Sequence, residues 1–297
     1  MKYKILKITT FSLFFSGIFF SCVKEEGIPE KNRLIKALNY STSASTKATD
    51  GIEYAYDNTG NMVKESFYDY NPTTGGLYMY HEYEYSGGKK VKMNMYNEKD
   101  KILRLNWYVD YFYEGEQLIK EEYRKADGFF SNSINYEYKN GNLIREYRYE
   151  PEKGVSDEIN YSYDNFNRII LKEIATIDIK DSKYTKYIYD NNEREIKVEY
   201  YNLDWVLIQS IEKIYNGRSK LPVKDLHYDK DGVQTLQYQH YYDKKGNLTE
   251  TRLDDHCSLF KRKYNGGLLM EEILYFDPVK DKNCLEKGMT RYEYQKL

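Results

Sequence analysis

The sequence predicts an all-β fold built from consecutive antiparallel β-hairpins. A tyrosine-centred phrase recurs about ten times in residues 51–297, at intervals of 22–30 residues, and repetition on this scale is typical of repeat architectures. Apolar and polar residues alternate before each central tyrosine, which is the pattern of a half-buried strand. Glycine and asparagine follow the tyrosine, and these residues accept the positive φ that tight turns require.

The clearest copy runs from Ile134 to Arg148. Tyr136 and Tyr138 alternate with polar residues, and the Asn-Gly pair that follows predicts a hairpin turn. We call the second tyrosine of each copy the anchor, and we expect each anchor to lie at the end of a strand, just before a turn. The anchors are Tyr56, Tyr85, Tyr113, Tyr138, Tyr163, Tyr189, Tyr215, Tyr242, Tyr264 and Tyr294.

Two copies depart from the glycine turn that follows the anchor. Asn167 occupies the glycine position in the fifth copy, and asparagine tolerates the left-handed conformation. Glu193 occupies that position in the sixth copy, so we expect a different turn there.

The position two residues before the anchor changes character along the chain. It is tyrosine in the first six copies and becomes Lys213, His240 and Arg262 in the next three. Three polar replacements in succession on a uniformly buried face would be costly, so we expect this face to open to solvent or to a groove. Together with the adjacent anchors, these side chains would bind an acidic or hydroxyl-rich ligand. The candidate site is Lys213, Tyr215, His240, Tyr242, Arg262 and Tyr264. Alternatively, the three polar side chains snorkel along the sheet edge and bind nothing, or most of the tyrosine rings form the core.

The repeated phrase resembles the YD-repeat or RHS-repeat family. The match is close at residues 54–62, Tyr-Ala-Tyr-Asp-Asn-Thr-Gly-Asn-Met, and residues 242–248 carry its second half. The resemblance covers roughly residues 50–297, and it implies a spiral of β-hairpins in one continuous, strongly twisted sheet. In large toxin-carrying members that sheet closes into a hollow shell. Residues 277–279, Asp-Pro-Val, lack the glycine of the self-cleavage motif of those members, which argues against a remnant of a toxin shell.

The N-terminal segment has the features of a lipoprotein leader. Residues 1–21 begin with lysines and continue as an uncharged apolar run that is too short to span a bilayer. Cys22 follows and resembles the lipidated cysteine of bacterial lipoproteins, whose acyl chains anchor the protein to a membrane. Residues 23–26, Val-Lys-Glu-Glu, resemble the acidic export signal of lipoproteins of Bacteroidota. We therefore predict an outer-membrane lipoprotein exposed at the cell surface.

Residues 22–50 then form the lipidated cysteine, a tether and a Ser/Thr-rich loop, before the repeat domain at 51–297. Within that segment, residues 34–40 are suited to a return strand without a first strand of its own. The chain ends on a first strand around Tyr294, so the array would stop on an exposed or capped edge. Cys257 and Cys284 are about one repeat apart and form a possible disulfide.

Composition excludes several functions. Without residues 1–21 the chain carries 42 basic and 47 acidic residues, a net charge of −5, so no nucleic-acid partner is expected. Adjacent residues of an extended strand point to opposite sides, so the ligand types gathered in residues 254–257, Asp-Asp-His-Cys, predict no metal site. No catalytic or phosphate-binding motif occurs, and we expect neither an enzyme nor a cofactor.

The leading interpretation is therefore a lipid-anchored binding module at the cell surface. Periodic tyrosine rings beside polar side chains suit a carbohydrate or an extended polypeptide. The alternative is a structural envelope protein without a small ligand.

Overall fold

The computed structural model describes residues 32–73, 75–99, 101–176, 183–253, 257–275 and 286–296. The leader, Cys22 and Cys284 lie outside the described residues, as does the side chain of Cys257, so the lipid anchor and the disulfide stay predictions.

The described residues form twenty strands: β1 Asn32–Tyr40, β2 Asp50–Tyr56, β3 Met62–Asp69, β4 Gly76–Ser86, β5 Lys89–Lys99, β6 Ile102–Glu114, β7 Gln117–Lys125, β8 Phe130–Lys139, β9 Asn142–Glu150, β10 Gly154–Tyr163, β11 Ile169–Thr176, β12 Lys183–Tyr189, β13 Glu195–Tyr201, β14 Leu207–Tyr215, β15 Pro222–Asp229, β16 Gln234–Tyr242, β17 Leu248–Leu253, β18 Cys257–Asn265, β19 Leu268–Tyr275 and β20 Glu286–Lys296.

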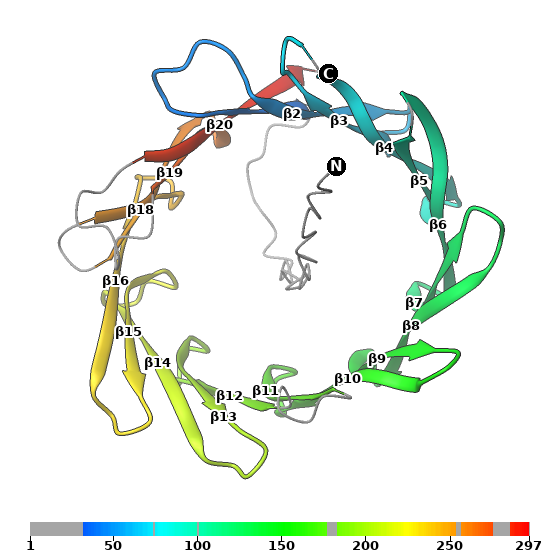
Figure 1. The fold of residues 1–297 in the computed structure, drawn as a ribbon. Coiled ribbons are helices and arrows are strands. Elements are labelled where there is room, and N and C mark those ends of the chain that lie inside the picture. Colours follow the sequence, from blue (N-terminus) through cyan, green and yellow to red (C-terminus); the bar gives the residue numbers. More distant parts are fainter. Residues whose placement is uncertain are drawn as a thin grey trace, which may run out of the picture.

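The twenty strands form one closed antiparallel sheet. Each strand pairs with the next in sequence, and β1 pairs with both β2 and β20. Seen end-on, the strands make a ring (Figure 1). The predicted hairpin repeats are confirmed, but they close into a ring and do not form the predicted spiral sheet. The reason is β1, the return strand without a first strand, which pairs with β20 and leaves no edge there.

Anchor tyrosines hold successive hairpins together. In the nine hairpins that follow an anchor, the pairing register shifts immediately before the anchor, as between Glu137 and Tyr138. Bulges of this kind at a rim increase twist and bend the strand. Every anchor hydroxyl donates a hydrogen bond to a backbone carbonyl near the start of the preceding return strand, at 2.7–3.1 Å. The anchors therefore lie at strand ends, as predicted, and tie each hairpin to the one before it.

Six turns share one side-chain-capped geometry. In each, an aspartate or asparagine side chain accepts the backbone N–H groups of the residues two and four positions later, as Asp190 does from Asn192 and Arg194. The fourth residue is left-handed, and it is Gly60, Asn167, Glu193, Trp205, Gly232 or Gly246. The prediction of a different turn at Glu193 is therefore wrong, because this turn has the same geometry as the other five. The Asp190 bonds, together with its ion pair to Arg194, outweigh the roughly 1–2 kcal/mol that a left-handed residue costs.

The sheet is a single-layered wall with two distinct faces. We call the face that carries the anchors the inner face and the opposite face the outer face. The two least exposed ion pairs between described strands, His240–Asp225 and His81–Glu65, both lie on the inner face, with side chains 12–22% exposed. Side chains converge and shield one another on the concave side of a closed sheet, which places the anchors inside.

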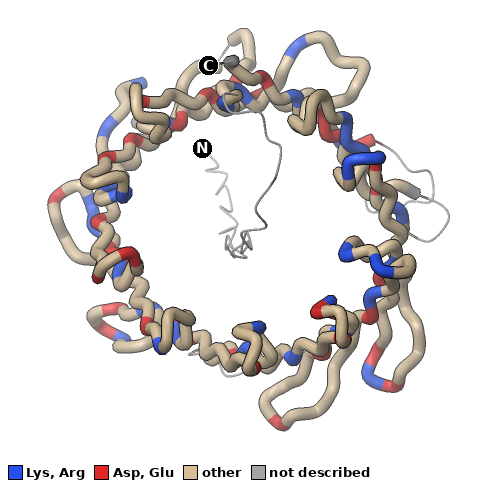
Figure 2. Tube along the Cα trace, turned by 180° about the vertical axis from the view of Figure 1, so that it is seen from behind, with Lys and Arg blue, Asp and Glu red and all other residues tan. Residues whose placement is uncertain are grey.

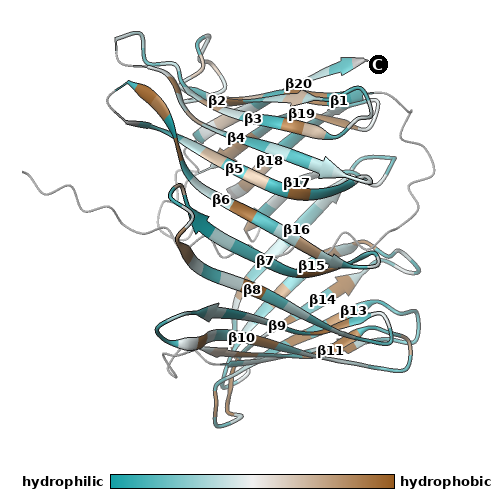
Figure 3. Ribbon diagram, turned by 90° about the vertical axis from the view of Figure 1, so that its right-hand side faces the viewer, coloured by the Kyte–Doolittle hydropathy of each residue, from teal (hydrophilic) through white to brown (hydrophobic). Residues whose placement is uncertain are grey.

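The side chains of the wall do not fill its centre. Twenty strands spaced about 4.8 Å apart have a circumference of at least about 95 Å, and so a diameter of about 30 Å. Two facing layers of side chains fill only about 10 Å. Accordingly, Val109 is the only large side chain in the described residues that is less than 2% exposed. Charged residues occur around the whole ring (Figure 2), and polar and apolar residues are mixed along the strands (Figure 3).

Candidate ligand-binding surfaces

The six predicted site residues lie on the inner face, on β14, β16 and β18. Lys213, His240 and Arg262 are each paired with a carboxylate of a neighbouring strand, which the sequence analysis did not identify. The nitrogen–oxygen distances are 2.6 Å to Glu195, 3.1 Å to Asp225 and 2.5 Å to Glu272, respectively. These carboxylates compensate the cost of burying Lys213, His240 and Arg262. An open groove is therefore not needed to explain three polar residues in succession on this face.

The three predicted tyrosines have equally specific partners. The hydroxyls of Tyr215, Tyr242 and Tyr264 donate to the backbone carbonyls of Glu195, Pro222 and Leu248. These bonds belong to the anchor series described above. A ligand role for the six residues stays a prediction. A ligand could contact only the faces of the tyrosine rings and charged groups that are already paired with carboxylates of the wall.

A hydrogen-bonded chain of three side chains crosses the inner face at His240. Its Nδ1 lies 3.1 Å from Thr251 Oγ1, and its Nε2 lies 3.1 Å from Asp225 Oδ2. A hydroxyl, an imidazole and a carboxylate in this order have the connectivity of a catalytic triad. Thr251, however, is a buried strand residue, and its hydroxyl is therefore shielded from a substrate. The chain orients His240 within the wall.

A second inner-face network is centred on Glu121. The hydroxyls of Tyr123 and Tyr136 donate to its two carboxylate oxygens at 2.7 and 2.9 Å. Burial raises the pKa of nearby Glu146, against the attraction of Lys172. The inner wall therefore stabilises its polar groups by bonds among themselves.

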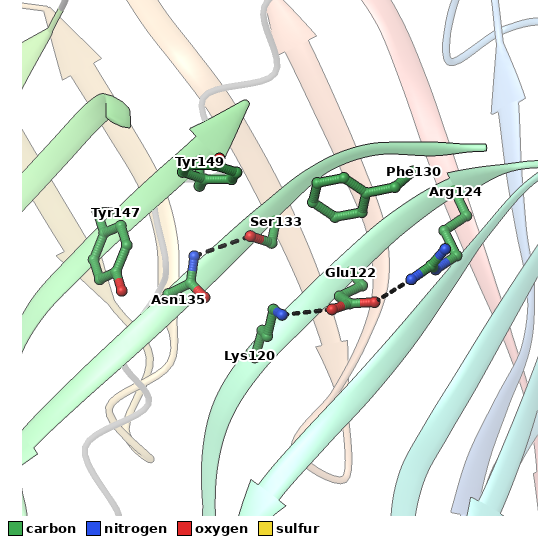
Figure 4. A pocket seen from close by; sticks show the side chains of 8 residues that line it. All are labelled: Lys120, Glu122, Arg124, Phe130, Ser133, Asn135, Tyr147 and Tyr149. Atoms are coloured by element: carbon green, nitrogen blue, oxygen red, sulfur yellow. Dashed lines mark hydrogen bonds and ion pairs between the residues drawn. The ribbon is translucent and has the colours of Figure 1, made fainter. Parts of the chain in front are cut away.

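The outer face contains an open hollow of about 350 Å³ across β7, β8 and β9. In Figure 4 its side chains lie in front of these strands, and strands of the opposite wall lie behind. Glu122, Ser133 and Tyr149 form one row across the three strands, because Ser133 pairs with both of the others. The neighbouring row is Lys120, Asn135 and Tyr147. The hollow lies over Ser133, a short side chain surrounded by longer ones and only 2% exposed.

One side of the hollow is charged and fixed in position. Glu122 accepts hydrogen bonds from Lys120 at 2.5 Å and from Arg124 at 2.7 Å. These bonds, the one from Lys120 first, lower the pKa of Glu122 below its ordinary value. At the floor, Asn135 Nδ2 donates to Ser133 Oγ at 3.0 Å. The hollow thus combines a permanent carboxylate with two cationic donors.

The other side of the hollow is aromatic. Tyr147 and Tyr149 project from β9 on the same face (Figure 4), and Tyr149 is 41% exposed. Arg145 lies over the Tyr147 ring with its guanidinium carbon 4.5 Å from the centroid. Within the described part of the chain, the hydroxyls of these two tyrosines have no hydrogen-bond partner. Phe130 completes the lining from β8.

Sequence reasoning missed this hollow because it treated the polar face of the strands as a solvated surface. The available signal was the alternation of Tyr147 and Tyr149 on the return strand, which places two rings on the polar face. Their position beside Ser133 and Glu122 depends on the pairing register of three strands.

Comparison with known proteins identifies no family for this chain. No family model matches it, and no curated protein matches it. Among solved structures, TcdB2-TccC3 without its hypervariable C-terminal region aligns with a TM-score of 0.45 and 17% identity over 76% of this chain. The chain spans only 12% of the length of that protein.

Two structures from Bacteroides also align. A porin-like protein from Bacteroides uniformis has a TM-score of 0.41 and 9% identity, covering 91% of this chain and 99% of that one. A DUF3836 family protein from Bacteroides vulgatus has a TM-score of 0.23 and 18% identity, covering 32% of this chain and 89% of that one. Within the described residues, no helix has the length and apolar character needed to cross a membrane.

Proposed function

We propose that this protein is a lipid-anchored binding module of the cell surface that holds a carbohydrate in the outer-face hollow of β7, β8 and β9. The observation that carries the proposal is the composition of the hollow. The exposed ring of Tyr149 and the half-buried ring of Tyr147 stand on one side, and a carboxylate with two cations stands on the other. A pyranose ring has an apolar C–H face that packs on an aromatic ring and a rim of hydroxyls that need donors and acceptors.

Closure of the sheet favours carbohydrate over extended polypeptide. An extended peptide gains most from adding as a strand to an exposed sheet edge. In the described sheet β1 is paired on both sides and β20 is paired with β19 and β1, so these terminal strands offer no edge. Recognition must then use side chains of a face, and the hollow supplies them.

The proposed placement rests on Cys22 and on the charges of the wall. Outer-face ion pairs such as Lys36–Glu53 and Lys197–Glu212 favour water on the outside of the cylinder. The lipid on Cys22 would then be the attachment to the outer membrane. A relationship to YD-repeat or RHS-repeat proteins belongs to the same proposal, supported by the repeated phrase and the hairpin array.

The second candidate is a structural envelope protein. Its support is the inner face, where the anchor bonds and the Glu121 network engage polar groups that a ligand would otherwise contact. In that case the hollow would bind nothing, and the protein would act through its rigid cylindrical shape.

Oligosaccharide binding distinguishes the two candidates. Purified full-length protein would be titrated by calorimetry with soluble hexasaccharides of glucose, mannose, galactose and N-acetylglucosamine. We expect saturable binding of at least one, weakened about tenfold by Tyr149→Ala, which removes a stacking ring. Tyr241→Ala is the matched control, since it removes an exposed outer-face tyrosine on β16, away from the hollow. Absence of binding to every sugar would contradict the proposal, and equal weakening by both variants would exclude the hollow as the site.

A further inference from the structure

Trp205 occupies a backbone position that ordinarily favours glycine. It is the fourth residue of the turn capped by Asn202, with φ of 58°, and the corresponding residue of three other turns is glycine. A bulky residue in the left-handed region is an outlier with an energetic cost. Trp205 is nevertheless 49% exposed, so burial of its ring does not repay that cost in full.

Stacking fixes the indole in a defined orientation. Its ring lies on Tyr184 with centroids 4.1 Å apart and an interplanar angle of 17°, and it lies 5.6 Å from the tilted Tyr201 ring. Tyr184 and Tyr201 are directly paired across β12 and β13. Their row lies beside that of Lys186 and Glu199. The exposed aromatic surface is therefore held rigid before any ligand arrives, which reduces the entropic cost of binding.

Polar groups next to the indole repeat the chemistry of the first hollow. Glu199, Ser210 and Tyr228 form one row across β13, β14 and β15, with the residue types of the Glu122, Ser133 and Tyr149 row. Ser210 is buried, as Ser133 is. The glutamate and the serine of the two rows stand at the same sequence distances from their anchors, Tyr138 and Tyr215, which are three repeats apart.

Glu199 is also held as an ionised acceptor. Tyr201 donates to it at 2.8 Å, and Lys197 and Lys186 approach its carboxylate at 3.4 and 3.8 Å. Burial alone would raise the pKa of Glu199, but the Tyr201 bond and the lysines lower it. Burial and the bond to Glu199 raise the pKa of Tyr201 to about 12. A carboxylate between two cationic side chains thus lies beside an aromatic surface, as in the first hollow.

We propose that Trp205, with Tyr184, Tyr201, Glu199 and Lys186, forms a second carbohydrate subsite. The apolar face of a pyranose ring stacks on the indole, and its hydroxyls bond to Glu199 and Lys186. The subsite rests on the same ligand class as the proposed function but uses different residues, so the two can fail separately. The exposed Val206 and Leu203 make a protein partner the competing occupant.

The chain offers a direct spectroscopic reporter for this subsite. It contains two tryptophans, and Trp107 lies on a different strand, β6. In full-length protein with Trp107→Phe, Trp205 is the sole source of indole emission. This protein would be purified in a detergent without a sugar headgroup and titrated with the same four hexasaccharides, and with a casein digest as the polypeptide probe. We expect at least one hexasaccharide to change the emission saturably and the digest to leave it unchanged.

Variants at Trp205 supply the matched controls. Trp205→Gly removes the ring and suits the left-handed backbone, so the fold is retained. We expect it to weaken calorimetric binding at this site about tenfold, whereas Trp205→Phe keeps a ring and loses less. Unchanged affinity of Trp205→Gly, or emission that responds to the digest and not to sugar, would overturn the subsite. If Tyr149→Ala abolishes all sugar binding while Trp205 emission never responds, only the subsite is wrong. If no sugar binds either variant or the parent protein, the proposed function fails as well.

Discussion

The hydroxyl of an anchor tyrosine should contribute measurably to stability. Tyr138 donates to the carbonyl of Leu118 at 3.0 Å, joining β8 to the start of the preceding return strand. Tyr138→Phe removes this bond without removing the ring. A hydrogen bond of this kind contributes about 1 kcal/mol net, and the orphaned carbonyl adds to the loss where water cannot reach it. We therefore expect the free energy of unfolding to fall by about 1–2 kcal/mol.

Urea unfolding monitored by circular dichroism measures this loss. The midpoint should fall while the slope with denaturant stays the same, because the surface exposed on unfolding hardly changes. Tyr149→Phe is the control, since the Tyr149 hydroxyl has no partner in the described part of the chain and its side chain is 41% exposed. This change should alter stability by less than about 0.5 kcal/mol. If both variants lose the same amount, or if Tyr138→Phe loses nothing, the anchor bonds do not stabilise the sheet.

Three further predictions follow from the leader, from a strained turn and from a capped turn. Cys22→Ser should release the protein from the membrane fraction, because the acyl chains attach there; retention at the parent level after carbonate washing would refute the anchor. Glu193→Gly should raise the free energy of unfolding by about 0.5–1 kcal/mol, since glycine adopts the left-handed φ of 63° at lower cost; a loss in urea unfolding would mean that the Glu193 side chain stabilises the turn. Hydrogen bonds from Thr59, above all, and from Asn61 lower the pKa of Asp57 to about 2. Ionised Asp57 therefore stabilises the fold, and this contribution is fully present above pH 3.8 and is lost as pH falls toward 2. An NMR titration of Asp57 should give a midpoint near 2. A midpoint near 3.8 would show that the cap does not form.

The local structure was predictable from sequence because its causes are local. Alternation fixed the face of Tyr136 and Tyr138, and the anchor position followed from the turn residues beside it. The turn at Glu193 was not predictable from its left-handed residue alone. The decisive groups are Asp190 and the backbone N–H groups that it accepts, a signal present in the sequence as an aspartate three residues earlier.

Closure and the outer-face hollow depend on contacts that sequence periodicity does not specify. Asn39 and Thr290 are hydrogen-bonded across 251 residues. The sequence marks β1 as a return strand and β20 as a first strand, each without its own partner, but the repeat phrase does not specify that these two strands pair with each other. The hollow requires Glu122, Ser133 and Tyr149 to share one row. A shift of one residue in either hairpin would move Ser133 to another row and expose different side chains. Pairing of Lys213, His240 and Arg262 with carboxylates likewise follows from register.

The closed sheet is tested most directly by a cross-link between its first and last strands. Leu38 and Arg291 are paired across β1 and β20, and the Cα separation of such pairs suits a disulfide. Full-length protein carrying Leu38→Cys and Arg291→Cys should form this bridge on mild oxidation, and mass spectrometry of the digested protein would identify the linked peptides. Leu38→Cys with Lys120→Cys, on β7, is the control and should not form a bridge. Accessible but unlinked thiols in the first variant, or equal bridging in both, would show that the sheet is open.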